Sequence, residues 1–165
     1  MPESFGSKLW RWRLNLFLMR AASGARVIYL AGDWRELRLK LVLNWRTDNY
    51  VGTIFGGSMY AAVDPFFMLM LIRNLGREYI VWDKAASIRF RKPARSTLYA
   101  RFALDEAELD AVRAAAAESP SIDRIYTVDL CDAQGVVHAS VQKTLYIRRK
   151  SEGERSTRDA QNHPL

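Results

Sequence analysis

The sequence predicts an α+β fold in which an antiparallel sheet wraps around one buried helix, and three patterns support this prediction. First, residues 58–72 form a nearly uncharged run in which Asp64 carries the only formal charge. A helix that is apolar on every side must be covered on every side. Second, several segments alternate apolar and polar residues, as strands with one face in the core do. Third, the elements follow the order strand, apolar helix, two strands, surface helix, two strands, which favours a sheet curled around the apolar helix.

Composition limits the function classes. The 165 residues are enough for one domain, and the apolar fraction of 49% with a charged fraction of 26% is typical of an ordinary globular protein. The net charge of +7 attracts phosphates, nucleic acid or an anionic membrane without choosing among them. Cys131 is the only cysteine, so neither a disulfide framework nor a cysteine-rich metal site is expected. We expect a cytoplasmic protein without a metal or cofactor.

The N-terminal segment has the pattern of an amphipathic helix. Residues Lys8–Ala22 place four apolar side chains at helical spacing, namely Leu9, Trp12, Leu16 and Met19. We favour a helix that packs over the domain with this stripe, and the alternative is a basic helix that lies on a membrane or lines an acyl tunnel. The longest apolar run, 59–72, is shorter than the roughly 20 residues that cross a bilayer, so no transmembrane segment is expected.

Three parts of the chain are predicted: an N-terminal helix in 1–24, the α+β domain in 25–149, and a disordered polar tail in 150–165. Strands are expected at Arg26–Ala31, Trp34–Asn44, Tyr79–Arg91, Thr97–Leu104, Ile122–Cys131 and Val136–Arg148. In Trp34–Asn44 the inward residues are leucines, at positions 37, 39, 41 and 43. If residues in Tyr79–Arg91 alternate strictly between the two faces of a strand, five of them share one face: Trp82, Lys84, Ala86, Ile88 and Phe90. A surface helix is expected at Asp105–Ser119, with Asp105 as its cap.

The start of the apolar helix is a candidate anion or oxyanion site. Gly56 and Gly57 precede the helix, and free amides at a helix N-terminus are preorganised donors for developing negative charge. The plainer interpretation is a tight turn that leads into a helix. Asp64 is the catalytic candidate, since a lone carboxylate in an apolar helix is costly unless it has a role or a partner. Its alternative role is structural, paired with an arginine or with backbone amides. Pro65 should kink the helix beside it.

The spacing between these groups implies two subunits if Asp64 is catalytic. Asp64 follows Gly57 by seven residues, which places it on nearly the same helix face but roughly 10 Å further along. One chain therefore cannot bring both to one carbonyl group. Two central helices that run antiparallel across a two-fold axis would bring Asp64 of one subunit to Gly56 of the other.

Two motifs carry a resemblance to known families. The string NWRTDNYVGTIFGGSMYAAVDP (44–65), followed by VWDKAASIRFRKPA (81–94), is similar to a bacterial hot-dog family catalogued only as a domain of unknown function, over most of residues 25–148. The spacing of Asn49, Gly56 and Asp64 resembles the motif of hot-dog acyl-CoA thioesterases related to the phenylacetate-degradation thioesterase. The fold that this implies is the hot-dog fold, a sheet wrapped around a central helix.

The resemblance also implies roles for these residues. The Gly56 amide would polarise a thioester carbonyl, Asn49 would orient a water or that carbonyl, and Asp64 would act as general base or nucleophile. Phe55 departs from the pattern, because the thioesterase relatives usually have histidine before the glycine pair. The backbone amides survive this change, but a polar side chain next to the reacting group is lost. Phe55 and Gly57 are predicted to line the substrate site.

The densest basic cluster lies at the end of the Tyr79–Arg91 strand and comprises Arg89, Arg91, Lys92 and Arg95. It suits the phosphates of coenzyme A. A solvated strand edge protected by its charges explains it equally well. Nucleic acid is not expected as a partner, because no nucleic-acid-binding motif accompanies the charge.

The leading functional hypothesis is a homodimer, or a dimer of dimers, that binds an acyl-CoA in an apolar tunnel beside the central helix and hydrolyses its thioester. Asp64, Asn49 and Gly56 are its predicted catalytic groups. Phe55, Gly57, Arg89, Arg91 and Lys92 are its predicted substrate contacts. The alternative is a non-catalytic hot-dog protein that binds an acyl group or coenzyme A, with Phe55 filling part of the site. A third hypothesis is a peripheral membrane protein that uses residues 8–22.

Overall fold

The computed structural model describes residues 2–20 and 23–151, with the side chains of 17–20 excepted. The helices are α1 (Phe5–Arg20), α2 (Gly56–Val63), α3 (Phe66–Leu75) and α4 (Glu106–Glu118). The strands are β1 (Ala25–Leu30), β2 (Glu36–Leu41), β3 (Tyr79–Phe90), β4 (Leu98–Ala103), β5 (Ile122–Cys131) and β6 (Val137–Arg149). The predicted α+β class is confirmed. The predicted polar tail lies outside the described residues, apart from its first two positions.

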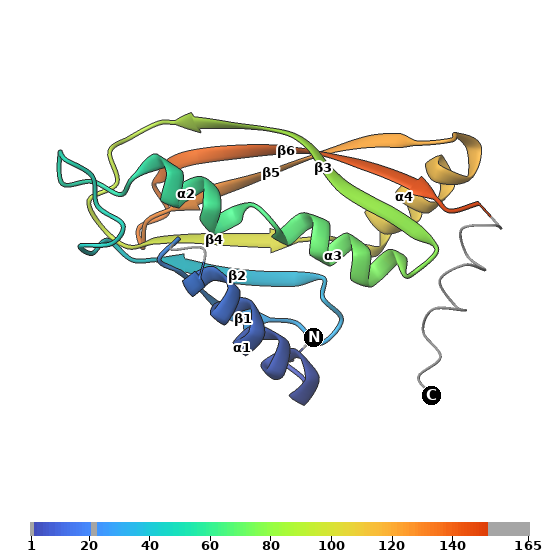
Figure 1. Cartoon of the computed structure of the whole chain (residues 1–165), viewed down its shortest axis with the longest axis horizontal. Coiled ribbons are helices and arrows are strands. Elements are labelled where there is room, and N and C mark those ends of the chain that lie inside the picture. The colour runs from blue at the N-terminus through green and yellow to red at the C-terminus, as the bar shows by residue number, and fades with distance from the viewer. Residues whose placement is uncertain (1, 21–22, 152–165) are drawn as a thin grey trace.

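The six strands form one antiparallel sheet in the order β1-β2-β4-β5-β6-β3. Helices α2 and α3 follow one another along one face of this sheet, between β3 and β6 on one side and β2 on the other (Figure 1). Helix α1 lies at the β1 end of the sheet, and β3 forms the opposite edge (Figure 1). This is the predicted sheet wrapped around a central helix.

The core lies between the sheet and helices α2 and α3. On the sheet, the core side chains come from strands in which buried and exposed residues alternate. In β2, Leu37, Leu39 and Leu41 are fully buried, which confirms the inward face predicted for these three leucines. Their partners across the ladder, Phe102 and Leu98, are also fully buried. Each such side chain stabilises the fold by roughly 1.5 to 3 kcal/mol relative to an exposed one, so this ladder fixes the register of the sheet.

The central helix breaks at Asp64 and Pro65, as the proline predicts. Helix α2 ends at Val63, and Pro65 is the N-cap residue of α3. Only the face toward the sheet is deeply buried. On the other side, Met68 and Leu69 are half-buried and Ile72 is exposed. The expectation of a helix covered on every side is therefore not met within one chain, because the sheet curls around only part of the helix surface.

The predicted face of β3 is wrong, because a bulge interrupts the alternation. The register of β3 against β6 shifts between Asp83 and Ala85. Before the bulge, Asp83 lies opposite the buried Leu145, and after it Ala86 lies opposite the buried Lys143. A bulge adds one residue to a strand, so it reverses which residues face inward. Trp82 and Asp83 both precede the bulge: Trp82 faces outward and is 68% exposed, whereas the Asp83 carboxylate lies 2.9 Å from the buried Lys143 ammonium.

Helix α1 packs on the domain, but not through the predicted stripe. Leu9, Trp12 and Leu16 are exposed, and Met19 lies among the side chains that the structure does not describe. The docked face instead uses Leu14, which is buried, and Asn15, which the pattern had placed elsewhere. The Asn15 amide donates to the Val27 carbonyl at 3.1 Å and accepts from the Val27 N–H at 2.6 Å. These bonds satisfy the open edge of β1, which explains why a polar residue faces the domain.

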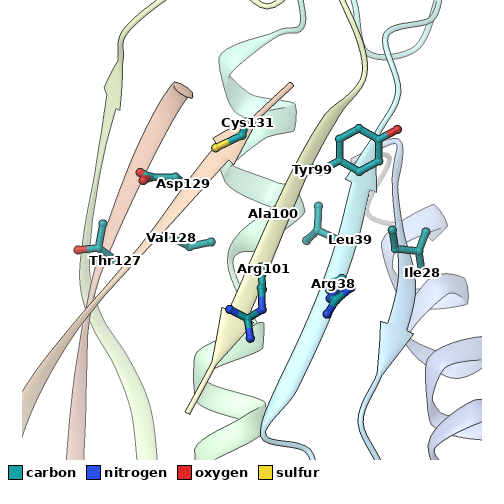
Figure 2. A pocket seen from close by; sticks show the side chains of 10 residues that line it. All are labelled: Ile28, Arg38, Leu39, Tyr99, Ala100, Arg101, Thr127, Val128, Asp129 and Cys131. Atoms are coloured by element: carbon teal, nitrogen blue, oxygen red, sulfur yellow. The ribbon is translucent and has the colours of Figure 1, made fainter. Parts of the chain in front are cut away.

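The sheet opens between β4 and β5. The two strands pair only at Tyr99 and Cys131, and the opening beside this pair holds a cavity of about 430 Å³. Tyr99 and Cys131 lie toward one end of the cavity, and Arg38 and Arg101 lie toward the other (Figure 2). Both arginines bond to the single carboxylate of Glu36 at 2.7 to 2.8 Å, so one of their two positive charges is compensated. Hydrogen bonds from these arginines, Arg101 first, lower the pKa of Glu36 to about 2 against its desolvation.

Candidate functional site

The turn before α2 is closed by Asn49. Its Oδ1 accepts hydrogen bonds from the N–H groups of Val51 and Thr53, each at 3.1 Å, and its Nδ2 donates to the Thr53 hydroxyl at 2.9 Å. Side-chain bonds of this kind replace backbone turn bonds. Buried Thr47 anchors the other side, because its carbonyl accepts from the Phe55 N–H at 2.7 Å. The Asn49 side chain therefore shapes the turn that delivers the chain to α2.

Helix α2 begins with free backbone donors. Phe55 is the N-cap residue, in extended conformation, and its side chain makes no capping hydrogen bond. The N–H groups of the first helical turn have no acceptor within the helix, and they lie at the positive end of its dipole. Both glycines are needed for close packing: a Cβ on Gly56 would lie 2.6 Å from the Phe90 ring, and one on Gly57 would lie 2.3 Å from the Phe55 ring.

Gly56, the first residue of α2, lines a cavity of about 550 Å³. Its wall includes the predicted site residues Asn49, Phe55, Gly56, Arg91 and Lys92. Gly57, Arg89 and Asp64 are not among the residues that line it. The structure thus brings together the glycine end of α2 and part of the basic cluster, and it leaves the candidate acid elsewhere.

His138 holds the basic wall of this cavity. Its Nδ1 lies 3.2 Å from the Pro93 carbonyl, and its Nε2 lies 3.1 Å from the Asp132 carboxylate. The His138 carbonyl also accepts from the N–H groups of Arg91 and Lys92. The histidine is buried on β6, so it positions the segment after β3.

Asp64 lies at the opposite end of α2 from Gly56, as its C-cap residue. Its Oδ1 accepts a hydrogen bond of 2.6 Å from the ammonium of Lys143, which comes from β6 and is only 1% exposed. The same ammonium lies 2.9 Å from Asp83 on β3. The Asp64 side chain remains 43% exposed, so one side of this carboxylate is open to a partner or ligand. The expected arginine or amide partner of Asp64 is replaced by a lysine.

Burial and pairing act in opposite directions on this ion cluster. Burial raises the pKa of Asp64, but hydrogen bonds from Lys143 and Tyr60 outweigh it, so the pKa lies below its ordinary value. For Asp83, burial wins over the lysine, and the pKa is raised. Burial lowers the pKa of Lys143, but its two carboxylate partners raise it above its ordinary value. Asp64 is therefore held ionised and is a weak base, beside a lysine whose charged form is favoured by its two carboxylate partners.

Sequence reasoning missed Lys143, Asp83 and Tyr60. For Lys143 a signal was present, because it occupies an inward position in β6 between Val141 and Leu145. A charge at an inward strand position needs a partner. A weaker signal marked Asp83, which lies two residues after the buried Val81 and so on the same face of β3, before the bulge.

Comparisons with known proteins agree with this architecture. A family model described as "Domain of unknown function (DUF4442)" matches residues 22–147. The chain belongs to this family. No curated protein matches the chain. The family assignment confirms the resemblance to a hot-dog family of unknown function.

Solved structures share the fold. A protein of unknown function from Pseudomonas aeruginosa, described as a probable thioesterase, superposes with a TM-score of 0.74 at 22% identity, covering 91% of this chain and 99% of its own. Thioesterase superfamily member 2 from Mus musculus gives 0.62 at 15% identity, with 87% and 98% covered. A thioesterase from Haemophilus influenzae gives 0.60 at 14% identity, with 84% and 90% covered. At these identities the likeness shows the fold alone, which is the hot-dog fold.

Proposed function

We propose that the protein is a cytoplasmic acyl-CoA thioesterase that acts as a homodimer or a dimer of dimers. The observation that carries the proposal is the arrangement of α2. Unpaired amides at its Gly56 end open into a cavity, and an ionised carboxylate, Asp64, stands at its other end. Amides and a carboxylate are the groups that a thioester hydrolase needs for its oxyanion and its nucleophile or base.

The exposed surface beside Asp64 supports a dimer. Strand β3 is the edge of the sheet, and its Trp82, next to Asp83 of the ion cluster, is 68% exposed. The face of α3 that carries Ile72 is uncovered as well. Antiparallel pairing of β3 with its copy would extend the sheet and lay the two α2 helices side by side in opposite directions. Asp64 of one subunit would then approach Gly56 of the other.

The chemistry follows from that approach. The thioester oxygen accepts a hydrogen bond from the Gly56 N–H, which stabilises the negative charge of the tetrahedral intermediate. Asp64 either attacks the carbonyl carbon itself or takes a proton from the attacking water. If Asp64 takes a proton from water, the hydroxide adds to the carbonyl carbon, the carbon–sulfur bond breaks, and Asp64 passes the proton to the departing thiolate. If Asp64 attacks the carbon itself, the carbon–sulfur bond breaks to give a mixed anhydride, and water then hydrolyses the anhydride to the free acid and protonated Asp64, whose proton goes to the thiolate. Arg91 and Lys92, on the cavity wall, suit the phosphates of coenzyme A.

Thiol release from short, long and aromatic acyl-CoAs tests the proposal. Asp64→Asn should remove most of the turnover. The matched control is Asp123→Asn, because Asp123 also accepts from a lysine at 2.6 Å but lies on the exposed face of β5. Full activity should persist in the control. Absence of turnover with every acyl-CoA, or a monomer by native mass spectrometry at assay concentration, would contradict the proposal.

A non-catalytic acyl-CoA-binding protein is the second candidate, and two observations favour it. Phe55 presents an apolar ring to the cavity and is 55% exposed, and Asp64 is already engaged by Lys143. In that case a coenzyme A thioester binds without being cleaved, and Asp64→Asn leaves its affinity unchanged or improved. Calorimetric titration of both proteins, combined with the thiol assay, separates the two functions.

A further inference from the structure

The outward face of α1 carries a line of large apolar side chains, here called the α1 stripe. Its members are Phe5, Leu9, Trp12 and Leu16, which are 87%, 53%, 64% and 37% exposed. Spacings of four, three and four residues place them on one side of the helix. Isolated apolar side chains on a surface are ordinary, but an aligned group of this size marks a docking surface.

The opposite face of α1 fixes the direction of the stripe. Asn15 bonds to both backbone groups of Val27, and Leu14 is buried in the core. The Trp10 ring meets the Trp34 ring edge-on at 5.5 Å, and the Arg73 guanidinium lies over both rings. Rolling the helix to bury the stripe would break these contacts. The stripe is therefore held facing away from the domain.

The charges around the stripe are all positive. Helix α1 contains no acidic residue. By helical position, Lys8 borders the stripe on one side and Arg13 on the other, and both are exposed. A further basic residue of α1, Arg11, lies 3.1 Å from Glu3 and is thereby compensated. An apolar stripe that contains tryptophan and is bordered by basic residues is the composition of helices that lie in the interface of a membrane.

A second copy of the chain is a poorer occupant. Two copies packed stripe to stripe would bring Lys8 and Arg13 of each close to those of the other, on chains that each carry +7. An anionic lipid surface complements both the stripe and its charged borders. We propose that α1 docks the protein on an anionic membrane, with the α1 stripe in the interfacial region and with Lys8 and Arg13 at the lipid phosphates.

The proposal is independent of the thioesterase hypothesis. Helix α1 lies at the β1 end of the sheet, and the β3 edge proposed for the dimer is the opposite end (Figure 1). Among the described residues no helix is long and apolar enough to cross a membrane, so the contact would be peripheral.

Sedimentation of the full chain with vesicles tests the proposal. The protein should pellet with an equal mixture of phosphatidylcholine and phosphatidylglycerol, much less with phosphatidylcholine alone, and less at high salt. Trp12→Glu should weaken binding to the mixed vesicles by about tenfold or more. The control Ile125→Glu changes a side chain of similar exposure, 62%, on β5 and should alter binding by less than about twofold. Lys8→Gln and Arg13→Gln should each weaken binding about fivefold.

Three results would overturn the proposal: no pelleting of the wild-type protein with the mixed vesicles, equal loss in Trp12→Glu and Ile125→Glu, or equal binding to neutral and anionic vesicles. Sedimentation velocity without lipid identifies the competing occupant. If Trp12→Glu dissociates an assembly that Ile125→Glu leaves intact, and neither protein binds vesicles, the stripe is a contact between copies. Matching thermal unfolding of the two variants confirms that both are folded.

Discussion

The two ends of α2 are positioned by different kinds of contact. The turn at the Gly56 end is closed mainly by its own neighbourhood, since Asn49, Thr53 and Thr47 bond within ten residues, with one distant backbone bond from the Ile54 N–H to the Ala94 carbonyl. The Asp64 end depends on Lys143, 79 positions later, and on a bulged strand that brings Asp83 to the same ammonium. A group held by local contacts can be recognised from a motif. A group held by distant side chains depends on the whole fold.

The largest effect is expected from removing the cation at the Asp64 end. Lys143→Met keeps most of the side-chain length but leaves Asp64 and Asp83 beside each other without a positive partner. Removing one partner of a buried ion pair costs about 3 kcal/mol or more. Because Asp64 is partly exposed, the expected loss of unfolding free energy lies at the lower end, about 3 kcal/mol. Urea unfolding measures it.

The matched control is Lys84→Met. Lys84 also lies 2.6 Å from a carboxylate, that of Asp123, but it is 55% exposed. Exposed pairs of this kind contribute less than about 1 kcal/mol. Equal losses in the two variants would mean that burial of Lys143 does not set the strength of the cluster.

The turn at the Gly56 end should be the next most sensitive. Asn49→Ala removes the acceptor for the Val51 and Thr53 N–H groups, which costs about 2 kcal/mol at about 1 kcal/mol for each bond. Asn49→Asp keeps the acceptor oxygens and should restore most of the stability. If Asn49→Asp is stable but has lost thioester hydrolysis, Asn49 contacts the substrate. If stability and activity change together, its role is confined to the turn.

Local patterns were sufficient to predict much of the fold. The alternating leucines of β2, the cap at Asp105 and the break at Pro65 are each determined by neighbouring residues, and the structure confirms all three. Asp105 accepts from the Glu108 N–H at 2.7 Å, as the capping pattern requires.

Two errors show where local reasoning fails. Strict alternation placed Trp82 and Ala86 on one face of β3, but the extra residue of a bulge reverses the order, and a bulge leaves no clear local pattern. The helical spacing of α1 grouped Leu9, Trp12 and Leu16 on one side of the helix, but the prediction that this side packs on the domain was wrong, because spacing alone does not say which side docks. The open edge of β1 decides it, because Asn15 satisfies backbone groups that an apolar side chain would leave unpaired.

A smaller effect is expected from closing the space at Gly56. In Gly56→Ala the new methyl group would lie 2.6 Å from the Phe90 ring, which must move. The expected cost is about 1 kcal/mol, as for modest overpacking. In a Phe90→Ala background the same substitution should cost much less, and the difference measures the contact. An unchanged cost in that background would show that α2 itself, rather than the ring, requires glycine.

The smallest and most specific effects concern the two carboxylates that share Lys143. The pKa of Asp64 is lowered in the folded protein, so its ionised form stabilises the fold above the ordinary value of 3.8. Asp64→Asn should therefore be less stable than the wild type at neutral pH. The difference should shrink as the pH falls below 3.8 and through the lowered pKa of the folded state.

Asp83 should behave in the opposite way. Burial, together with the charge of Asp64, raises its pKa against the effect of Lys143, so the folded state favours protonated Asp83. That contribution is present below the ordinary pKa of 3.8 and is lost as the pH rises through the raised value. Asp83→Asn should thus be slightly more stable than the wild type at neutral pH and equal to it in acid.

Both differences should stay below about 1 kcal/mol, because both side chains are partly exposed. Urea unfolding of both variants at neutral and acidic pH measures them, and shifts of the same sign at neutral pH would show that the lysine holds the two acids equivalently.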